Sequence, residues 1–459
     1  MLKTCTNNLW GKKLKINNNE IYSFISEHPL EKYSALPFCD AAQIEDIQNS
    51  LFLKHLEYAA TKSPFYKELF KSNNINYKDI KNIGEIRNIP LTDKSDLSEK
   101  NSRFLAVSER EIIDVCLTSA TTGSNQTPLF QTSHDLARLA YNEKIAFEMA
   151  GLTENDTILI CAALDRCFMA GLAYFLGGSK LNAKMVRAGA GSPAQQWHLL
   201  KITKATAIVG VPSLMREIAR YALDNGETPS AMGIKRLVAI GEPTRDQSLT
   251  LLPVAQQLES LWGAPIFSTY ASTELATTFC ECFSRQGGHL RPELCVLEIV
   301  DEKGQHVADG EQGEVVVTPL GVKGMPLLRF KTGDVSFVIN ETCSCGCRTP
   351  RLGPILGRKY QRLKYKGTTL FPNTILSVLE GIEKFHGGYV EVRKNEDGTD
   401  RLIVFAAITD SSLTSDFLKE ELRARLRVVP EIFFISQEEL NNKIYNSNKR
   451  KKNTFFDLR

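Results

Sequence analysis

The chain has 459 residues, which is enough for a large hydrophobic core and predicts two or more domains. The 56 Lys and Arg residues nearly balance the 53 Asp and Glu residues, and the net charge of +3 argues against nucleic-acid binding through overall basic charge. We find no signal peptide and no run of roughly 18 apolar residues, so we expect a cytoplasmic protein that does not enter a membrane. The 11 cysteines are too few for a disulfide scaffold in a chain of this length.

The first half of the chain predicts helices and a parallel sheet. Residues 41–72 carry apolar side chains at helical spacing, with a break at Ser63-Pro64. Short apolar runs then alternate with helical segments such as 213–223. These runs are found at 157–160, 207–210 and 237–240. Continuous runs of this kind, separated by helices, predict a parallel sheet that helices cover on both faces.

The pattern changes toward the C-terminus. Residues 296–337 are rich in strand-like runs, and we expect a mainly antiparallel part there. Beyond residue 357 the sequence predicts a small α+β domain of about a hundred residues. Its predicted elements are strands at 389–393 and 402–408, a turn at Asp397-Gly398 and a helix from Ser415.

The segment 117–128, LTSATTGSNQTP, combines hydroxyl groups and a glycine directly after a strand-like run at 112–116. Backbone N–H and side-chain O–H groups in such a loop bind phosphate. The segment lacks the Gly-Lys-Ser/Thr end of a Walker loop, and by itself it is also compatible with a polar surface turn. The motifs that follow it favour the phosphate interpretation.

Further motifs occur in a fixed order along the chain. They are Thr118-Ser-Ala-Thr-Thr-Gly123, Gly241-Glu-Pro243, Tyr270-Ala-Ser-Thr-Glu274, Arg329-Phe-Lys-Thr-Gly-Asp334, Gly357-Arg358 and a C-terminal lysine cluster. This series resembles the adenylate-forming (AMP-binding) superfamily. The chain is also similar to the phenylacetate-CoA ligase family, through Ser63-Pro-Phe-Tyr66, Pro90-Leu-Thr-Asp-Lys94, Met325-Pro-Leu-Leu-Arg329, Cys343-Ser-Cys-Gly346 and the closing Asp457-Leu-Arg459. So many motifs in the right order are hard to obtain by chance.

The resemblance implies an α/β fold with two domains. Residues 1–357 would form a large multi-sheet adenylation domain with a parallel sheet and a small antiparallel part, and residues 358–459 a small mobile α+β lid. The implied reaction joins a carboxylic acid to the α-phosphate of ATP, releases pyrophosphate, and passes the acyl group to a thiol. Mg²⁺ is the implied cofactor, coenzyme A (CoA) the expected acceptor, and a small aromatic acid the expected substrate.

Two other functions remain open at this point. One is an adenylating enzyme that loads a carrier protein or an amine, and the other is a non-catalytic nucleotide-binding scaffold. The oligomeric state is also open, with a homodimer as one option.

The family resemblance assigns roles to individual residues. Ser119, Thr121, Thr122 and Gly123 would hold the β- and γ-phosphates, with Thr122 also acting in catalysis. The remaining nucleotide contacts would come from Gly241, Glu242 and Pro243 along the adenine, Tyr270 stacked on the base, Ala271, Ser272 and Thr273 beside it, Glu274 on Mg²⁺, Asp334 on the ribose hydroxyls, and Arg358. The alternatives are a turn residue for Asp334 and a surface charge for Arg358.

The family also presents a C-terminal lysine that bridges the carboxylate and the α-phosphate. Counting back from Asp457 assigns this catalytic role to Lys451, and a small slip would move it to Lys449 or Lys452. The alternative is a solvated basic tail.

A separate set of residues suggests a structural metal. Cys282, His289, Cys343 and Cys345 fall where some relatives place ligands, and three thiolates with one imidazole would complete tetrahedral zinc. Cys280 and Cys347 compete as ligands, and packed reduced thiols are the alternative.

The chain departs from the family pattern at several positions. Ala120 and Ala271 stand where glycine is common, and residues 124–127 lengthen the phosphate loop. Tyr360 and Gln361 replace two acidic residues, the first of which acts as the hinge for the small domain in relatives. Residues 168–171 and 240–241 are candidates for the acid pocket, although Phe168 is equally compatible with the hydrophobic core.

Overall fold

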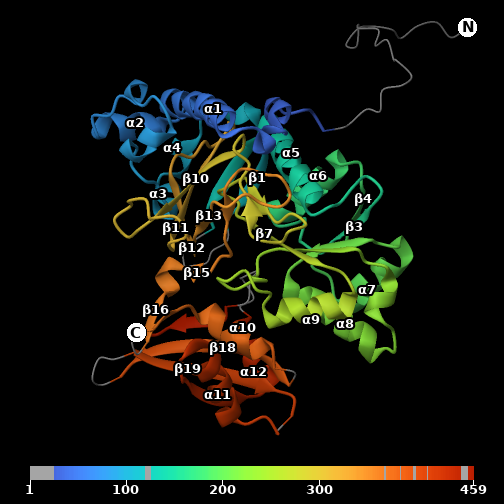
Figure 1. The fold of residues 1–459 in the computed structure, drawn as a ribbon. Helices are drawn as coiled ribbons and strands as arrows, with labels where there is room; N and C mark the ends of the chain where they lie inside the picture. The colour runs from blue at the N-terminus through green and yellow to red at the C-terminus, as the bar shows by residue number, and fades with distance from the viewer. Residues whose placement is uncertain are drawn as a thin grey trace, which may run out of the picture.

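The computed structural model describes residues 25–118, 126–365, 368–382, 384–395, 400–410, 412–445 and 453–459. A large part contains the elements up to β15, and a smaller part below it in Figure 1 contains the elements from β16 onward. Among the described residues, no helix is both long enough and apolar enough to cross a bilayer.

The large part contains a six-stranded sheet with the order β4-β3-β5-β6-β7-β8. Its strands are β3 (Thr157–Ile160), β4 (Lys184–Arg187), β5 (Ala207–Gly210), β6 (Arg236–Ala239), β7 (Ile266–Ala271) and β8 (Thr278–Cys280). All neighbouring pairs are parallel except β7 with β8. The parallel sheet predicted from the apolar runs is therefore confirmed, and β3 and β5 have the predicted bounds.

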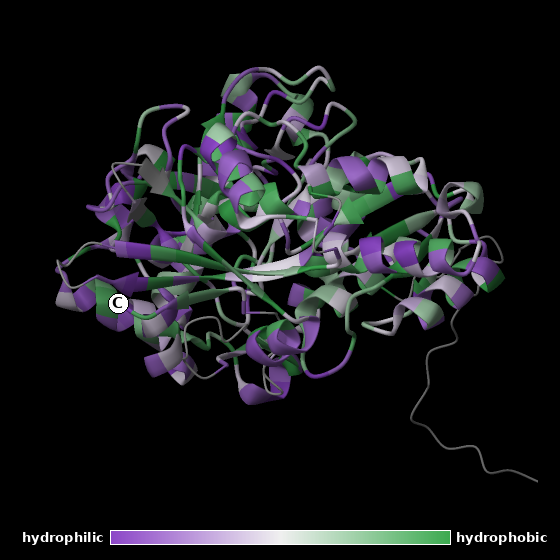
Figure 2. Cartoon of the chain, turned by 90° about the horizontal axis from the view of Figure 1, so that it is seen from below, coloured by the Kyte–Doolittle hydropathy of each residue, from purple (hydrophilic) through white to green (hydrophobic). Residues whose placement is uncertain are grey.

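Helices cover both faces of this sheet, as predicted. Ile158 and Ile160 of β3 pack in a cluster with α5 (Ser133–Met149) and α6 (Met169–Lys180). Leu159 between them packs on the opposite face with α7 (Pro193–Thr203), α8 (Pro212–Asp224) and α9 (Pro253–Trp262). Because side chains alternate along a strand, a strand covered on both faces is apolar throughout. Figure 2 shows apolar residues gathered along the strands in the middle of the molecule.

The remaining sheets of the large part are antiparallel. A four-stranded sheet has the order β10-β11-β12-β15, from β10 (Cys295–Val300), β11 (Gly313–Pro319), β12 (Phe330–Ser336) and β15 (Gly357–Arg358). A three-stranded sheet combines β9 (Gly288–His289), β13 (Val338–Ile339) and β14 (Arg351–Leu352), and a hairpin combines β1 (Ile112–Leu117) with β2 (Pro128–Thr132). The antiparallel part expected at 296–337 is thus present.

The N-terminal region is helical. Its helices are α1 (Ala41–Lys62), α2 (Pro64–Ser72), α3 (Lys94–Glu99) and α4 (Asn101–Phe104), joined by 3-10 turns at Pro29–Tyr33, Leu36–Phe38, Tyr77–Asp79, Ile83–Asn88 and Glu109–Glu111. The carboxylate of Asp40 accepts a hydrogen bond from the N–H of Gln43 and so caps α1. Helix α1 ends at the predicted break, because Pro64 has no N–H to continue it.

The smaller part has its own core and a four-stranded sheet with the order β20-β19-β18-β21. Its elements are β16 (Leu363–Tyr365), β17 (Thr368–Leu370), α10 (Pro372–Glu380), β18 (Phe385–Lys394), β19 (Asp400–Ile408), α11 (Ser415–Leu426), β20 (Glu431–Ile435), α12 (Gln437–Ile444) and β21 (Phe455–Asp457). The predicted strands lie within β18 and β19, and α11 begins at the predicted Ser415. The turn at Asp397-Gly398 lies outside the described residues.

The two parts contact each other through α9 and α10 and through the ion pair of Glu302 with Arg362. Helix α10 packs against α9, and an added side-chain carbon on Gly381 would lie 2.4 Å from Cβ of Pro253. Strand β15 pairs with β12, with Arg358 opposite Asp334. The boundary that we propose between residues 357 and 358 therefore falls inside β15, so that Arg358 belongs to the sheet of the large part.

Candidate active site

The predicted adenine and metal motifs meet at the carboxyl edge of the parallel sheet. The segment 241–243 follows β6, and Tyr270 lies near the end of the neighbouring β7. The hydroxyl of Thr269 donates to the carbonyl of Ala239 at 2.9 Å and ties the two strand ends together. Ligands of open α/β sheets bind at this edge. Gly241 makes the turn with a φ of 69°, a left-handed conformation that favours glycine.

Glu242 is already occupied by a structural contact. Its carboxylate accepts hydrogen bonds from the N–H of Ser213 at 2.8 Å and from the hydroxyl of the same residue at 2.6 Å. A carboxylate at the start of a helix satisfies free N–H groups and interacts favourably with the helix dipole. The side chain of Glu242 therefore fixes the 241–243 segment to α8, and the backbone of the segment is what remains for a ligand.

Tyr270, Asp334 and Arg358 form one connected group. The hydroxyl of Tyr270 donates to Oδ2 of Asp334 at 2.9 Å, and Nε of Arg358 lies 3.4 Å from Oδ1 of the same carboxylate. Burial, and then the charge of Asp334, raise the pKa of Tyr270 well above its usual value, so the phenol stays protonated. Burial alone would lower the pKa of Arg358, but the Asp334 carboxylate outweighs it and the pKa is raised.

Glu274 lies beside this group and pairs with a residue from the N-terminal region. Its carboxylate Oε1 is 3.5 Å from Nζ of Lys94, which begins α3, and its side chain is only 5% exposed. Thr273 and Glu274 also line a small cavity of about 30 Å³ together with Gln131 of β2 and Met169 of α6. Ala271 is exposed and Ser272 half-buried in the same segment.

The predicted phosphate loop connects the β1–β2 hairpin. Its residues Ser119, Thr121, Thr122 and Gly123 lie outside the described residues, as do Lys449, Lys451 and Lys452. The base of the hairpin is described: the N–H of Thr118 donates to the carbonyl of Thr127, and the N–H of Thr127 donates to the hydroxyl of Thr118, both at 3.0 Å. Gln131 of the same hairpin reaches the Glu274 cavity, so the hairpin and Glu274 are neighbours.

The candidate acid-pocket residues are packed together. Phe168 and Ala170 are half-buried against the apolar cluster that contains Ile160 and Ile240. An added side-chain carbon on Gly171 would lie 2.1 Å from the carbonyl oxygen of Ala163, so this glycine allows α6 to approach the chain after β3.

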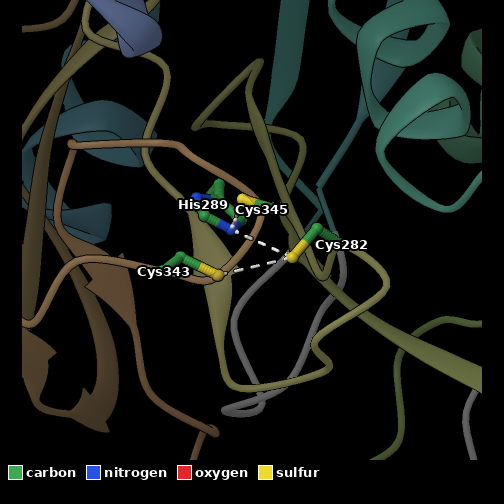
Figure 3. Close-up of side chains that lie close together, drawn as sticks. All are labelled: Cys282, His289, Cys343 and Cys345. Atoms are coloured by element: carbon green, nitrogen blue, oxygen red, sulfur yellow. Dashed lines mark hydrogen bonds between the residues drawn. The ribbon is translucent and has the colours of Figure 1, made fainter.

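The structure brings the four predicted metal ligands to one place (Figure 3). Cys282 follows β8, His289 ends β9, and Cys343 and Cys345 lie between β13 and β14. Their ligand atoms all lie within 4.8 Å of one another. The Sγ atoms of Cys282 and Cys343 are 3.6 Å apart, and Nε2 of His289 is 3.3 Å from Sγ of Cys282 and 3.5 Å from Sγ of Cys345.

The competing cysteines are not part of this group. Among the described residues, the cluster contains neither Cys280 nor Cys347. The thiol of Cys280 donates to the carbonyl of Glu281, and the thiol of Cys347 interacts with that of Cys345 from outside the four-residue group. The geometry therefore favours Cys282, His289, Cys343 and Cys345 over the competing cysteines as a candidate metal site.

The comparisons with known proteins agree with this arrangement. A family model described as AMP-binding enzyme matches residues 44–322, which is more than half of the chain. The chain belongs to the AMP-binding enzyme family. It is 27% identical to the phenylacetate-coenzyme A ligase of Thermus thermophilus over 364 residues, covering 78% of this chain and 80% of that relative. The resemblance inferred from the motifs is confirmed.

Two solved structures of another ligase share the fold of this AMP-binding enzyme and differ in arrangement. A structure of 2-hydroxyisobutyryl-CoA ligase in the postadenylation state has a TM-score of 0.82 and 21% identity, and the match covers 96% of this chain and 95% of that chain. The same ligase in the thioesterification state has a TM-score of 0.69 and 20% identity, with 96% and 97% covered. The predicted fold class is confirmed, and the present arrangement is more similar to the postadenylation structure.

Several buried charges that support the site of this AMP-binding enzyme were missed by sequence reasoning. Arg138 in α5 donates to the carbonyl of Ala276 and, at 3.0 Å, to the hydroxyl of Thr277, directly after Glu274. Arg245, two residues after the adenine segment, pairs with Glu281 at 2.6 Å. The only sequence signal for such residues is a charge within an otherwise apolar, periodic element, because a buried charge needs partners.

A third buried charge begins the motif that carries Asp334. Arg329 makes an ion pair with Glu298 at 2.7 Å and donates to the carbonyl of Ile89 at 2.7 Å. It thereby joins β12 to β10 and to the N-terminal region, which fixes the strand on which Asp334 lies.

Proposed function

We propose that this AMP-binding enzyme is an AMP-forming acid–CoA ligase, which adenylates a carboxylic acid with ATP and then transfers the acyl group to CoA. The observation that carries the proposal is the group formed by Tyr270, Asp334 and Arg358 beside Glu274. It combines an aromatic ring, a carboxylate suited to a pair of hydroxyl groups and a second buried carboxylate at one sheet edge. A nucleotide presents the matching base, ribose and metal-bound phosphates.

The nucleotide would occupy this edge in a defined orientation. Tyr270 would stack on the base, with the backbone of 241–243 along the adenine and the segment 271–273 beside it. The carboxylate of Asp334, held in place by the Tyr270 hydroxyl and by Arg358, would accept the two ribose hydroxyls. Because these contacts are made before the ligand arrives, little ordering is needed on binding.

Glu274 is suited to a magnesium ion. Mg²⁺ is usually held by one or two carboxylates together with substrate phosphates, and Glu274 offers a buried carboxylate that pairs with Lys94 at 3.5 Å. When bound, the metal would neutralise charge on the phosphate oxygens. Ser119, Thr121, Thr122 and Gly123 would hold the β- and γ-phosphates from the nearby hairpin, and Lys451 would contact the carboxylate and α-phosphate in the adenylation step.

The cluster of Cys282, His289, Cys343 and Cys345 fits a structural zinc ion. Tetrahedral zinc with bonds of about 2.3 Å to sulfur and 2.0 Å to nitrogen separates two sulfurs by about 3.8 Å and sulfur from nitrogen by about 3.5 Å. Three of the six separations, at 3.3–3.6 Å, are close to these values, and all six are within 4.8 Å. Burial, Arg351 and Arg291 lower the pKa of His289 to about 4, which keeps the imidazole neutral. With four protein ligands the site would be closed and would take no part in the reaction.

The acid and the acceptor follow from the relatives. Because the curated relative from Thermus thermophilus is a phenylacetate-coenzyme A ligase, we propose a small aromatic acid as substrate and CoA as acceptor. The higher TM-score to the postadenylation structure supports a small domain, 358–459, that is oriented here for adenylation and turns for thioester formation. A cytoplasmic location, where ATP and CoA are available, and a homodimer are part of the same proposal.

Release of pyrophosphate tests the first half of the reaction. The protein is incubated with ATP, Mg²⁺ and a panel of aromatic and aliphatic acids that includes phenylacetate, and thioester formation is then followed after CoA is added. Pyrophosphate release that depends on one acid, followed by its CoA thioester, supports the proposal. Release without a CoA thioester indicates a carrier protein or an amine as acceptor. Nucleotide binding without release for any acid indicates a non-catalytic scaffold and contradicts the proposal.

A further inference from the structure

Helix α8 carries a buried arginine whose side chain has no partner among the residues that the structure describes. The structure describes six arginines that are at least nine-tenths buried, and five of them donate hydrogen bonds to carboxylate, hydroxyl or carbonyl oxygens. These five are Arg138, Arg245, Arg291, Arg329 and Arg351. Arg216 is the sixth. It is 6% exposed, its Nε is buried without a partner, and it makes no ion pair or hydrogen bond with any described residue.

A second arginine lies one helical turn further along α8. Arg220 is half-buried and likewise makes no ion pair or hydrogen bond with the described residues. Burial, and then the positive charge of Arg216, lower its pKa, whereas the charges of Glu217 and Asp224 act in the opposite direction. Side chains four residues apart on a helix are neighbours. The two guanidinium groups are therefore neighbours, and neither makes an ion pair with a described carboxylate.

This pair is unfavourable in the free protein. Guanidinium groups stay charged in proteins, and a buried charge without a partner costs stability. Buried polar groups that lack a protein partner are commonly used by a ligand or by water. A pair of arginines is well matched to a phosphate, because each planar group can donate two parallel hydrogen bonds to phosphate oxygens.

The pair lies close to the proposed nucleotide site. Ser213 in the first turn of α8 holds the carboxylate of Glu242, and Arg216 is three residues further along the same helix. Because long side chains on a helix lean toward its N-terminus, we expect Arg216 to lean toward the sheet edge where the nucleotide would bind. The neighbouring helix α9 is the one on which α10 of the small domain packs (Figure 1).

We propose that Arg216 and Arg220 form a binding site for a phosphate group of CoA. The proposal rests on the acid–CoA ligase function. Two positive charges match the charge of about −2 on a phosphate monoester more closely than the single charge of a carboxylate. Because Arg220 is half-exposed, the site opens at the surface, where the nucleotide end of CoA would lie while its thiol reaches into the protein.

Kinetics with shortened acceptors test this site. We compare CoA, dephospho-CoA and pantetheine as acceptors for the wild type, Arg216→Gln, Arg220→Gln and the double variant. Loss of a charged hydrogen bond is worth roughly a 10- to 100-fold change in binding. We therefore expect a rise of this size in the KM for CoA in Arg216→Gln, and an equal KM for pantetheine in all variants. If the substitutions raise the KM for dephospho-CoA as much as the KM for CoA, the bound group is the diphosphate. If they leave the KM for dephospho-CoA unchanged, the bound group is the 3′-phosphate.

Matched variants separate binding from a structural role. Lys201→Gln removes one positive charge from the neighbouring α7, and we expect it to leave the KM for CoA unchanged. Arg216→Lys should restore part of the CoA affinity. Arg216→Met should raise Tm because it removes an unpaired buried charge, whereas a structural arginine would lower Tm when replaced. An unchanged KM for CoA in the double variant would overturn the proposal. So would a rise in the KM for pantetheine equal to the rise in the KM for CoA.

Direct titration keeps this test independent of the reaction. Calorimetric binding of CoA to the wild type and to Arg216→Gln can be measured whether or not an acid substrate is known. Binding of CoA that weakens in Arg216→Gln supports the site even if no acid releases pyrophosphate, in which case only the ligase function fails. No binding of CoA to a wild type that does release pyrophosphate rejects the site and leaves adenylation intact.

Discussion

The ammonium group of Lys94 lies 3.5 Å from the carboxylate of Glu274, and this ion pair joins the N-terminal helical region to the proposed magnesium ligand. The Glu274 side chain is 5% exposed, whereas that of Lys94 is 38% exposed. The lysine can therefore move away into solvent, but the carboxylate cannot. A cation that enters the site competes with Lys94 for the same oxygen.

This competition leads to a prediction for Lys94→Gln. Without the ammonium group, the carboxylate of Glu274 is free for the metal, and the Mg²⁺ concentration for half-maximal pyrophosphate release should fall roughly fivefold, the equivalent of about 1 kcal/mol. Magnesium titrations at saturating ATP measure this change. Lys384→Gln, which breaks an exposed ion pair with Asp410 in the small domain, is the control. An unchanged Mg²⁺ requirement together with a higher KM for ATP would contradict the competition.

The hydrogen bond from Tyr270 to Asp334 predicts graded effects on ATP binding. Asp334→Asn should raise the KM for ATP roughly 10- to 100-fold, because hydrogen bonds to a charged acceptor contribute about 1.5–3 kcal/mol. Tyr270→Phe removes only the hydroxyl that orients the carboxylate, and a rise of about fivefold is expected. Initial-rate kinetics with varied ATP measure both.

A substrate lacking one hydroxyl provides the control for Asp334. For the wild type, the KM for 2′-deoxy-ATP should exceed the KM for ATP by nearly as much as Asp334→Asn raises the KM for ATP. For Asp334→Asn, the KM values for the two nucleotides should be equal. Asp416→Asn on the exposed face of α11 should behave as the wild type. If Asp334→Asn discriminates against the deoxynucleotide as strongly as the wild type, Asp334 does not bind the ribose.

The metal cluster predicts different outcomes for two neighbouring cysteines. Cys345→Ser removes a proposed ligand, so the purified protein should lose most of its zinc and unfold at a lower temperature. Cys347→Ser changes a buried thiol outside the cluster and should keep one zinc per chain. Elemental analysis and thermal unfolding measure these outcomes. Equal zinc content in the two variants, or no zinc in the wild type, counts against a zinc site.

The buried pair of Arg245 and Glu281 predicts a large loss of stability. Their side chains are 6% and 2% exposed, and the second carboxylate oxygen of Glu281 accepts the N–H of Ser268 at 2.9 Å. Glu281→Gln leaves the Arg245 charge without compensation, and breaking a buried pair in this way costs about 3–5 kcal/mol. The exposed pair of Arg401 and Glu431 is the control, and Glu431→Gln should cost under about 1 kcal/mol. If urea unfolding gives the same loss of unfolding free energy for Glu281→Gln and Glu431→Gln, the prediction is wrong.

The buried carboxyl of Glu143 predicts a pH-dependent stability. Burial raises its pKa from 4.5 to about 7, although hydrogen bonds from Thr278 and Asn142 act in the opposite direction. A raised pKa in the folded state means that the folded protein holds the proton more tightly than the unfolded chain. The stabilisation from this group is therefore complete below pH 4.5, declines between pH 4.5 and 7, and is absent above pH 7.

Glu143→Gln removes this dependence. The free energy of unfolding of the variant relative to the wild type should rise by about 3 kcal/mol between pH 4.5 and 7 and stay constant above pH 7. Urea unfolding at several pH values measures the difference, and the other titrating groups cancel because both proteins share them. A difference that does not vary with pH shows that the carboxyl titrates normally.

Local patterns in the sequence predicted several of the elements and the parallel pairing of the central sheet. The runs at 157–160 and 207–210 are continuous and apolar because helices cover both faces of β3 and β5. The break before α2 follows from Pro64, and the start of α11 at Ser415 follows from its capping pattern. These features depend on residues that are close along the chain. They can therefore be predicted without knowledge of the tertiary structure.

Other features became visible only in the tertiary structure. Cys282 and Cys343 are 61 positions apart, and only the pairing of β14 with β9 brings their two loops together and leaves out Cys280 and Cys347. The contact between Lys94 and Glu274 likewise depends on how the N-terminal region packs. Spacing along the chain does not encode such contacts, because they result from the packing of distant elements.

The sequence by itself determined the motif series, and with it the family and the residues that would bind a nucleotide. The tertiary structure decided which partner each side chain has. It assigned the carboxylate of Glu242 to α8 and the hydroxyl of Tyr270 to Asp334, and it left Arg216 buried without a partner among the described residues. The physical reason is that residue type sets which bonds a group can form, whereas burial and distance decide which of those bonds are made.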